Sequence, residues 1–296
     1  MRIVSLLPST TETLFAIGAG DDVVGVTFEC DHPAEARTRT IVSTSALPDG
    51  LAPGRIDEIV SRRMAAGEDL YHLDQGALAG LDADLVVTQD LCAVCAVDVS
   101  NVQDALEHLV CSADVLTIDP QNLAEVLASV RTLGNATGTG DRADELVTSL
   151  TGRLDAVRAT IAHRRHVPAL VLEWTDPPFA PGHWVPDMVE AAGGTCVLGE
   201  AGERSYRTDP AVVRGSAAEV VVCAPCGFGL DESTRLAHEL VEHDGVAPGT
   251  PVWAVDANAS FARPGPRLVD GVEALAAILH PEAAGPPDPA LARRVR

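Results

Sequence analysis

One long amphipathic stripe near the middle of the sequence constrains the fold most. Between Asp141 and His163, apolar residues recur at spacings of three and four, at positions 143, 146, 147, 150, 154, 157 and 161. This periodicity is typical of a helix with one buried face. A helix of about 23 residues would be ~35 Å long at 1.5 Å per residue. We expect it to run along two lobes and to join them.

Short β-rich runs alternate with helical patterns on both sides of this stripe. The alternation is the signature of a parallel sheet covered by helices. We therefore predict an α/β fold with two Rossmann-like lobes and a ligand cleft between them. The predicted divisions are a first lobe (1–136), a linking helix (137–166), a second lobe (167–280) and a proline-rich tail that we expect to be disordered (281–296).

The individual elements follow from the same patterns. Strands are predicted at Arg2–Leu6, Val23–Val26, Thr40–Val42, Leu85–Thr88, Val115–Ile118, Ala169–Glu173, Thr195–Leu198, Glu219–Cys223 and Val252–Val255. Helices are predicted at Pro53–Ala66, Gln75–Ala79, Val102–Leu109 and Leu123–Leu133. A capping box at Ser9–Glu12 predicts where the first helix begins.

Charge and composition exclude several classes of function. A formal net charge of −22 would repel a nucleic-acid backbone or an anionic membrane surface, so no nucleic-acid partner is expected. All 21 basic side chains are arginine, which excludes mechanisms that need a P-loop or Schiff-base lysine. No apolar run approaches the ~18 to 20 residues of a spanning helix, so no membrane insertion is expected. Because the first residues lack a signal-peptide core, we expect a cytoplasmic location.

The loops that follow the predicted strands define a candidate binding site. In open parallel sheets, ligands bind beyond the carboxyl ends of the strands. The residues predicted to bind the ligand are Pro8, Ser9, Thr10, Phe28, Glu29, Cys30, Asp90, Trp174, Phe179, His183, Trp184, Phe228 and Phe261. Six of the ten aromatic residues lie in or beside these loops, which favours walls for a flat or bulky apolar ligand. The alternative is that they pack the loops against the sheets.

Cysteines also gather at the predicted strand ends. Soft thiolates bind zinc or iron–sulfur clusters, and the candidate metal ligands are Cys30, Cys92, Cys95 and Cys226. The alternative is that each C-x-x-C pair consists of small packed thiols. The sequence contains no nucleophile elbow, zinc-protease helix motif or dinucleotide-binding glycine turn, so we do not expect an enzyme.

Several segments resemble the cobalamin- and siderophore-binding proteins of ABC importers. They are Arg2–Glu12, Ala83–Val87 and Val189–Gly194, and the resemblance runs in order to about residue 280. It implies two lobes bridged by one long helix and non-catalytic capture of a small molecule between them. The segments 88–92, 182–186 and 224–228 are more similar to the cobalamin branch, which implies a corrinoid ligand.

Two positions depart from that family. Its members carry one glutamate on each lobe to engage arginines of the permease, and the corresponding residues here are Gly76 and Pro210. Neither side chain can form a salt bridge, so docking to an ABC permease is doubtful. We therefore expect a cytosolic corrinoid-binding protein uncoupled from a permease. The alternative function is a thiolate metal or iron–sulfur protein.

Overall fold

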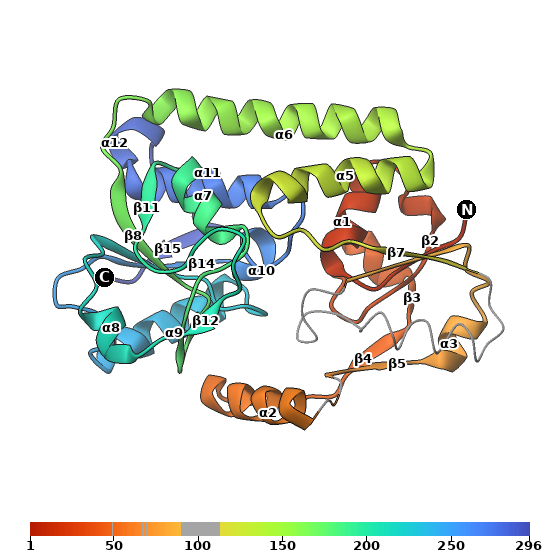
Figure 1. Ribbon diagram of the computed structural model, residues 1–296, viewed down its shortest axis with the longest axis horizontal. Helices are drawn as coiled ribbons and strands as arrows, with labels where there is room; N and C mark the ends of the chain where they lie inside the picture. The colour runs from red at the N-terminus through yellow and green to blue at the C-terminus, as the bar shows by residue number, and fades with distance from the viewer. Residues whose placement is uncertain (49, 67, 69, 90–112) are drawn as a thin grey trace. The chain divides into compact units, whose positions relative to one another are not determined.

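The structure, a computed structural model, describes residues 1–48, 50–66, 68, 70–89 and 113–296 (Figure 1). The predicted helix at 102–109 and the candidate residues Asp90, Cys92 and Cys95 lie outside the described residues. The chain divides into two compact units. The first comprises Met1–Pro120 with Leu127–Val147, and the second comprises Gln121–Val126 with Thr148–Arg296.

The first unit is built on a parallel five-stranded sheet in the order β3-β2-β1-β6-β7. Its strands are β1 (Ile3–Ser5), β2 (Val23–Val26), β3 (Thr40–Ile41), β6 (Leu85–Thr88) and β7 (Asp114–Thr117). Successive side chains point to opposite faces of a strand. Ile3 accordingly joins a core with Leu14 and Val130, whereas Val4 joins a separate core with Leu78 on the other face.

This unit also contains helices and a small antiparallel ribbon. They are α1 (Pro8–Ala16), α2 (Pro53–Ala66), α3 (Gln75–Ala79), α5 (Leu123–Thr137), the short η1 (Gly20–Asp22) and η2 (Ala34–Thr38), and the antiparallel pair β4 (Ser43–Ser45) and β5 (Tyr71–Leu73). The helix α6 (Gly140–Ile161) begins in this unit. The division between the units falls within α5 and α6.

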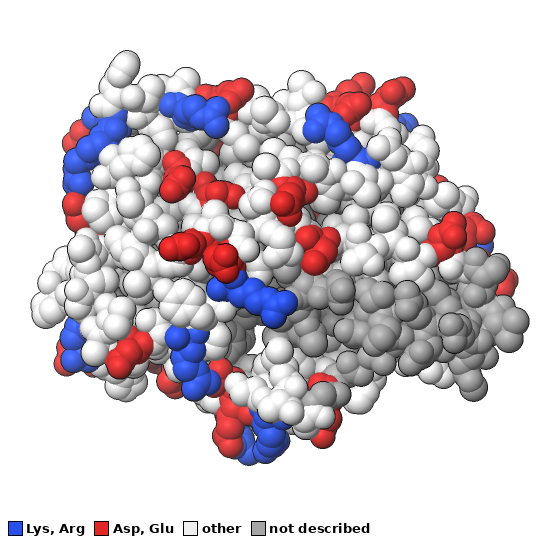
Figure 2. All heavy atoms as spheres, viewed as in Figure 1, with Lys and Arg blue, Asp and Glu red and all other residues white. Residues whose placement is uncertain are grey.

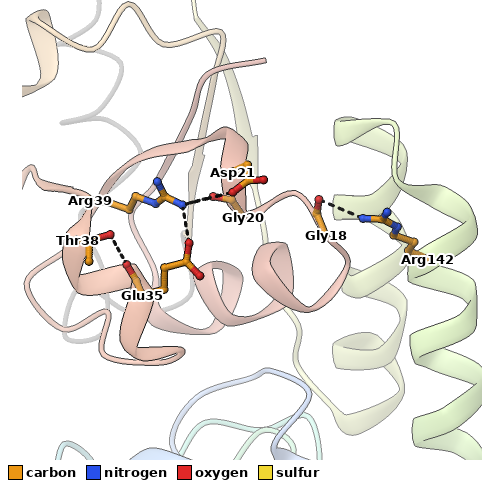
Figure 3. A network of polar contacts seen from close by, with 7 residues as sticks. All are labelled: Gly18, Gly20, Asp21, Glu35, Thr38, Arg39 and Arg142. Carbon is orange, nitrogen blue, oxygen red and sulfur yellow. Dashed lines mark hydrogen bonds and ion pairs between the residues drawn. The ribbon is translucent and has the colours of Figure 1, made fainter.

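Two arginines hold the turn that follows α1 (Figure 3). Arg39 Nη2 donates to the carbonyl oxygen of Gly20 at 3.1 Å and to Glu35 at 3.3 Å. Its guanidinium lies 5.6 Å from the centre of the Phe15 ring. Arg142, on α6, donates to the carbonyl oxygen of Gly18 at 3.4 Å. These bonds fix the α1–β2 connection and leave the carboxyl ends of the strands to other residues.

The second unit contains a five-stranded sheet in the order β11-β8-β13-β14-β15 and a three-stranded antiparallel sheet β12-β10-β9. The strands are β8 (Val167–Leu172), β9 (Trp174–Thr175), β10 (Pro178–Ala180), β11 (Gly194–Cys196), β12 (Tyr206–Arg207), β13 (Val220–Cys223), β14 (Val252–Val255) and β15 (Ala292–Arg294). The helices are α7 (Val185–Ala191), α8 (Pro210–Arg214), α9 (Leu230–Glu242), α10 (Ala257–Ser260), α11 (Leu268–Leu279) and α12 (Pro281–Ala284). The predicted α/β class with two Rossmann-like lobes is confirmed.

The central stripe forms one uninterrupted helix, α6, of 22 residues. Its stripe residues Ala143, Val147 and Leu150 are buried, as the spacing predicts. Within the second unit, Arg153 of α6 donates to Asp270 at 2.5 Å and to Glu273 at 2.6 Å, which fastens α6 to α11. None of the described helices combines the length and the apolar character that a membrane span requires.

Two local predictions differ from the structure. The capping box is not formed: α1 begins at Pro8, and its cap residue Leu7 makes no side-chain bond. Proline fixes the helical φ at the first position, so the helix begins before Ser9 and that residue is buried inside it. The segment 281–296, predicted as a disordered tail, instead contains α12 and β15, and β15 pairs antiparallel with β14.

The last residue explains why this segment is ordered. Arg296 donates from Nε to the carbonyl oxygen of Thr250 at 2.9 Å and from Nη2 to that of Ala247 at 2.8 Å. Ala292 is buried in the sheet beside β14. The four prolines that suggested disorder lie outside β15, so they do not interrupt its ladder.

Candidate functional site

In the first unit, the residues after β1 and β2 form a closed network of neutral polar groups. Thr11 Oγ1 lies 2.8 Å from Ser5 Oγ, 3.0 Å from the carbonyl oxygen of Leu7 and 3.1 Å from Cys30 Sγ. Thr10 Oγ1 lies 2.7 Å from Ser5 Oγ. All of these residues are buried, so their hydrogen-bonding groups satisfy one another inside the unit.

This burial decides how the predicted ligand residues of the first unit are placed. Pro8, Ser9 and Thr10 belong to the first turn of α1 and are buried. Cys30 is 2% exposed and lies within 3.3 Å of Thr27 Oγ1. These four side chains therefore support the strand ends from inside and do not present themselves to solvent.

Phe28 and Glu29 are the half-buried members of the same loop. The Phe28 ring lies 5.9 Å from the ring of Tyr71, whose hydroxyl donates to Glu29 Oε2 at 3.5 Å. Tyr71 comes from β5, which belongs to a ribbon that the sequence patterns did not predict. Sequence reasoning therefore missed Tyr71, although an aromatic residue between two short polar runs was a signal that could have indicated it.

In the second unit, the loops after β8 and β13 bring aromatic side chains together. Trp174 and Phe228 pack with ring centres 5.6 Å apart and planes tilted by 31°. The Trp174 indole N–H donates to the carbonyl oxygen of Asp176 at 3.0 Å. Phe179 is half-buried, and the guanidinium of Arg207 lies 6.0 Å from its ring centre. We call Trp174, Phe179 and Phe228 the aromatic cluster of the second unit.

Trp184 and Phe261 are placed differently from the aromatic cluster. Their exposed fractions are 6% and 2%, and the indole N–H of Trp184 donates to the carbonyl oxygen of Phe261 at 2.7 Å. Both side chains are core residues that fasten the start of α7 to the end of α10. These two aromatic residues therefore pack their loops against the second unit, which is the alternative stated for the loop aromatics.

The half-buried residue Glu173 lies among the loops of the second unit. Glu173 follows β8, and its Oε1 accepts a hydrogen bond from the backbone N–H of Gly182 at 3.0 Å. The Ser205 hydroxyl also donates to this carboxylate. Burial raises the pKa of Glu173 to about 7, against the lowering effect of those two bonds. Sequence reasoning missed Glu173, which was predicted as the last residue of a strand.

His183 follows Gly182 in the chain and has a strained backbone. Its φ is 51°, and its backbone N–H donates to the carbonyl oxygen of Glu203 at 2.6 Å. Its Nε2 is buried and has no hydrogen-bond partner among the described residues. Burial, and then the positive charge of Arg204, lower the pKa of His183, so the imidazole is neutral at pH values near 7.

The described candidate metal ligands do not form a cluster. Cys30 is buried among the hydroxyls of the first unit, whereas Cys226 is exposed on the loop after β13 in the second unit. Within the ranges that the structure covers, no group of three or more His, Cys, Asp or Glu side chains could hold a metal ion. Cys92 and Cys95 lie outside those ranges, so the four-cysteine hypothesis stays a prediction.

Two surface hollows are found among the described residues. One of about 560 Å³ surrounds the turn from Gly134 to Arg142 between α5 and α6. The other, of about 490 Å³, lies against α8 and is lined by Val197, Leu198 and Val212 among others. Neither contains a predicted ligand-binding residue.

The two positions assigned to permease docking are both exposed. Gly76 lies in α3, and Pro210 is the first residue of α8. Each helix is capped by an aspartate, Asp74 and Asp209, whose carboxylate accepts a bond from a backbone N–H of its own helix. The absence of a glutamate at both positions is predicted to weaken docking to a permease, and this stays a prediction.

Arginines of the described surface are largely matched by neighbouring carboxylates. Arg55 pairs with Glu58, Arg158 with Asp155, and Arg235 with Glu232 and Glu239. On the face seen in Figure 2, acidic and basic side chains are interspersed with uncharged surface. The excess of negative charge is thus not offset by a continuous basic patch on that face.

Comparison with known proteins identifies the family of this chain. A family described as periplasmic binding protein matches residues 3–248. An uncharacterised ABC transporter substrate-binding lipoprotein of Bacillus subtilis, YvrC, is 25% identical over 291 residues, which are 95% of this chain and 80% of that protein. The predicted resemblance to the substrate-binding proteins of ABC importers is thereby confirmed at the level of the family.

Solved structures share the fold at low sequence identity. The periplasmic vitamin B12-binding protein BtuF of Vibrio cholerae is similar with a TM-score of 0.69 and 18% identity, over 94% of this chain and 96% of that one. A periplasmic heme-binding protein of Pseudomonas aeruginosa has a TM-score of 0.72 and 18% identity, over 98% and 96%. At these identities the likeness concerns the fold.

The expectation of a cytoplasmic location is wrong. The matching family consists of periplasmic proteins, the Bacillus subtilis relative is a lipoprotein, and both solved structures are those of periplasmic proteins. These findings point outside the cytoplasm. The N-terminal apolar run misled the prediction because Ile3 and Val4 form the fully buried centre of β1, so their sequence reflects core packing and carries no information about export.

Proposed function

The chain belongs to the periplasmic binding protein family, and we propose that its ligand is a corrinoid. In this proposal it is an extracytoplasmic substrate-binding protein of the ABC-importer type. Members of this family bind a small molecule without converting it. The observation that carries the proposal is the aromatic cluster of the second unit, which stands on the hairpin β9–β10 and the loop after β13, beyond the carboxyl ends of the parallel strands β8 and β13. Flat apolar ring faces suit a large planar ligand.

Two relatives support a ligand of the tetrapyrrole class. The solved structures of similar fold include one protein that binds vitamin B12 and one that binds heme. Both ligands are broad and flat, so an aromatic surface suits either. The net charge of −22 favours the corrinoid, since its side chains are mostly neutral amides whereas heme carries two carboxylates.

A titration of the full chain tests this proposal. Cyanocobalamin, cobinamide and hemin are each added to purified protein while the visible spectrum and the calorimetric heat are followed. We expect a dissociation constant of about 1 µM or lower for a corrinoid and weaker binding of hemin. Binding of hemin alone would keep the tetrapyrrole class and remove the corrinoid, whereas absence of binding for all three probes would overturn the proposal.

A pair of variants tests the aromatic cluster itself. Trp174→Ala removes one ring of the Trp174–Phe228 pair, and we expect about tenfold weaker corrinoid binding. Val212→Ala is the matched control, since Val212 is 47% exposed on α8, which bears no member of the aromatic cluster. Equal affinity of both variants and the unmodified protein would place the ligand elsewhere.

The same preparation decides the metal alternative. Elemental analysis of anaerobically purified protein should find no stoichiometric zinc or iron if the ligand is a corrinoid bound by loops and ring faces. Stoichiometric metal that is lost in the Cys92→Ser, Cys95→Ser double variant would instead establish the thiolate site.

A further inference from the structure

Four backbone segments of the second unit meet at Glu173. Its Oε1 accepts from Gly182 N at 3.0 Å, and its other carboxylate contact is the hydroxyl of Ser205. Its own backbone N–H donates to the carbonyl oxygen of Phe179 at 3.1 Å, and its carbonyl oxygen accepts from Cys226 N at 3.0 Å. One residue therefore contacts the hairpin β9–β10, the loop before α7, the loop before β12 and the loop after β13.

Two of these loops touch without side chains between them. A Cβ placed on Gly182 would lie 2.2 Å from the backbone nitrogen of Ser205, so only glycine fits there. The neighbouring backbone adds two bonds, from His183 N to Glu203 O at 2.6 Å and from Gly202 N to His183 O at 3.0 Å. The Glu173 carboxylate adds the bonds to Gly182 and Ser205 to this junction.

Removing the carboxylate would leave the junction short of an acceptor. The N–H of Gly182 is directed at Oε1, and Gly182 is buried, so water could not replace that bond without opening the loop. The Glu173 side chain also accepts from Ser205, so one side chain bonds to both loops of the junction.

We propose that Glu173 is a positioning residue: its carboxylate ties the loop before α7 and the loop before β12 to the hairpin β9–β10, and so keeps Trp174 and Phe179 of that hairpin in the arrangement that receives the ligand. The proposal rests on the proposed function, because it assigns a role to the same aromatic cluster. Glu173 acts through hydrogen bonds to Gly182 and Ser205 and does not itself contact the ligand. None of the sequence patterns that identified the loops indicates this role.

Binding measurements with two substitutions at one position test the role. Glu173→Ala removes both acceptor oxygens, and we expect about tenfold weaker binding of cyanocobalamin. Glu173→Gln keeps an oxygen that can accept from Gly182, so we expect its affinity to return to within about threefold of the unmodified protein. Glu190→Gln removes a nearby charge on α7 and should leave affinity unchanged. An Ala variant that binds as well as the unmodified protein would overturn the proposal.

Amide hydrogen exchange without ligand separates this proposal from the proposed function. In Glu173→Ala we expect the segment 181–205 to exchange at least about ten times faster, while the strands β13 and β14 keep their protection. Glu173→Gln should restore the slow exchange of Gly182. If none of the corrinoid or heme probes binds the unmodified protein, the proposed function fails while this test still applies. Unchanged exchange of 181–205 in the Ala variant would refute the role of Glu173 even if the probes bind.

Discussion

The strand-end loops of the two units are held together by different chemistry. In the first unit, hydroxyls and one thiol bond to one another: Ser5, Thr10, Thr11 and Cys30 are all buried and uncharged. In the second unit, the Glu173 carboxylate accepts hydrogen bonds from Gly182 and Ser205, in the loops before α7 and β12 that flank the hairpin β9–β10. A neutral network keeps its bonds over a wide pH range, whereas a buried carboxylate changes charge near pH 7. We therefore expect the hydrogen bonds around Glu173 to respond to pH and those of the hydroxyl network around Thr11 not to respond.

The largest effect is expected where backbone meets backbone in the second unit. Gly182→Ala would force a Cβ to within 2.2 Å of Ser205 N and 2.6 Å of Glu203 O, both of which are backbone atoms. We expect a loss of about 3 kcal/mol or more in the free energy of unfolding, measured in urea. Gly152→Ala in α6 is the control, because nothing lies within 4 Å of its added Cβ. There we expect a gain of up to about 1 kcal/mol.

The pH dependence of stability should come next. The pKa of Glu173 is raised from 4.5 to about 7, so the folded protein binds more protons than the unfolded chain between these values. Stability should therefore fall as pH rises through this interval, by up to about 3 kcal/mol, and be lowest above pH 7. Glu173→Gln cannot ionise, so relative to the unmodified protein it should be more stable at about pH 8 than at about pH 5. Parallel pH profiles from urea denaturation would contradict the assignment.

A smaller, pH-independent effect is expected in the first unit. Thr11→Val keeps the shape of the side chain but removes the hydroxyl that approaches Ser5, Leu7 and Cys30. We expect a loss of about 1 to 2 kcal/mol, equal at about pH 5 and about pH 8, since no partner in this network carries a charge. A loss that changed with pH would break the contrast between the units.

The smallest expected effect is a difference in reactivity between the thiols of the folded protein, which requires no substitution. Cys226 is exposed, whereas Cys30 is 2% exposed and burial raises the pKa of Cys223 to about 12. A thiol reagent followed by peptide mass mapping should label Cys226 in the folded protein within minutes. Cys30 and Cys223 should react only when the protein unfolds. Early labelling of Cys30 would mean that the first unit's network opens readily.

Local sequence patterns predicted the framework well. The predicted strands Val23–Val26 and Val252–Val255 and the helix Pro53–Ala66 have the same bounds in the structure. Hydrophobic runs and turn residues act over a few positions, so these elements could be predicted without knowing their neighbours. The small ribbons β4–β5 and β9–β10 were missed, because strands of two or three residues leave almost no periodicity to detect.

The candidate site was predicted only in outline. The loops that carry it follow from strand order, but the direction of each side chain does not. Trp184 and Trp174 stand in similar proline-containing surroundings in the sequence, yet Trp184 is a core residue, whereas Trp174 begins β9 and packs on Phe228. Which way each ring points depends on partners far along the chain, such as Phe261 for Trp184.

By itself the sequence determined the alternation of strands and helices, the long helix α6 and the loops that end each strand, because these depend on patterns within a few turns of chain. The tertiary structure alone decided that Glu173 would hold four loop segments and that residues 292–294 would complete a sheet. Both depend on contacts across tens of residues. Such contacts form only when burial of the cores has brought distant segments together, and no local pattern encodes them.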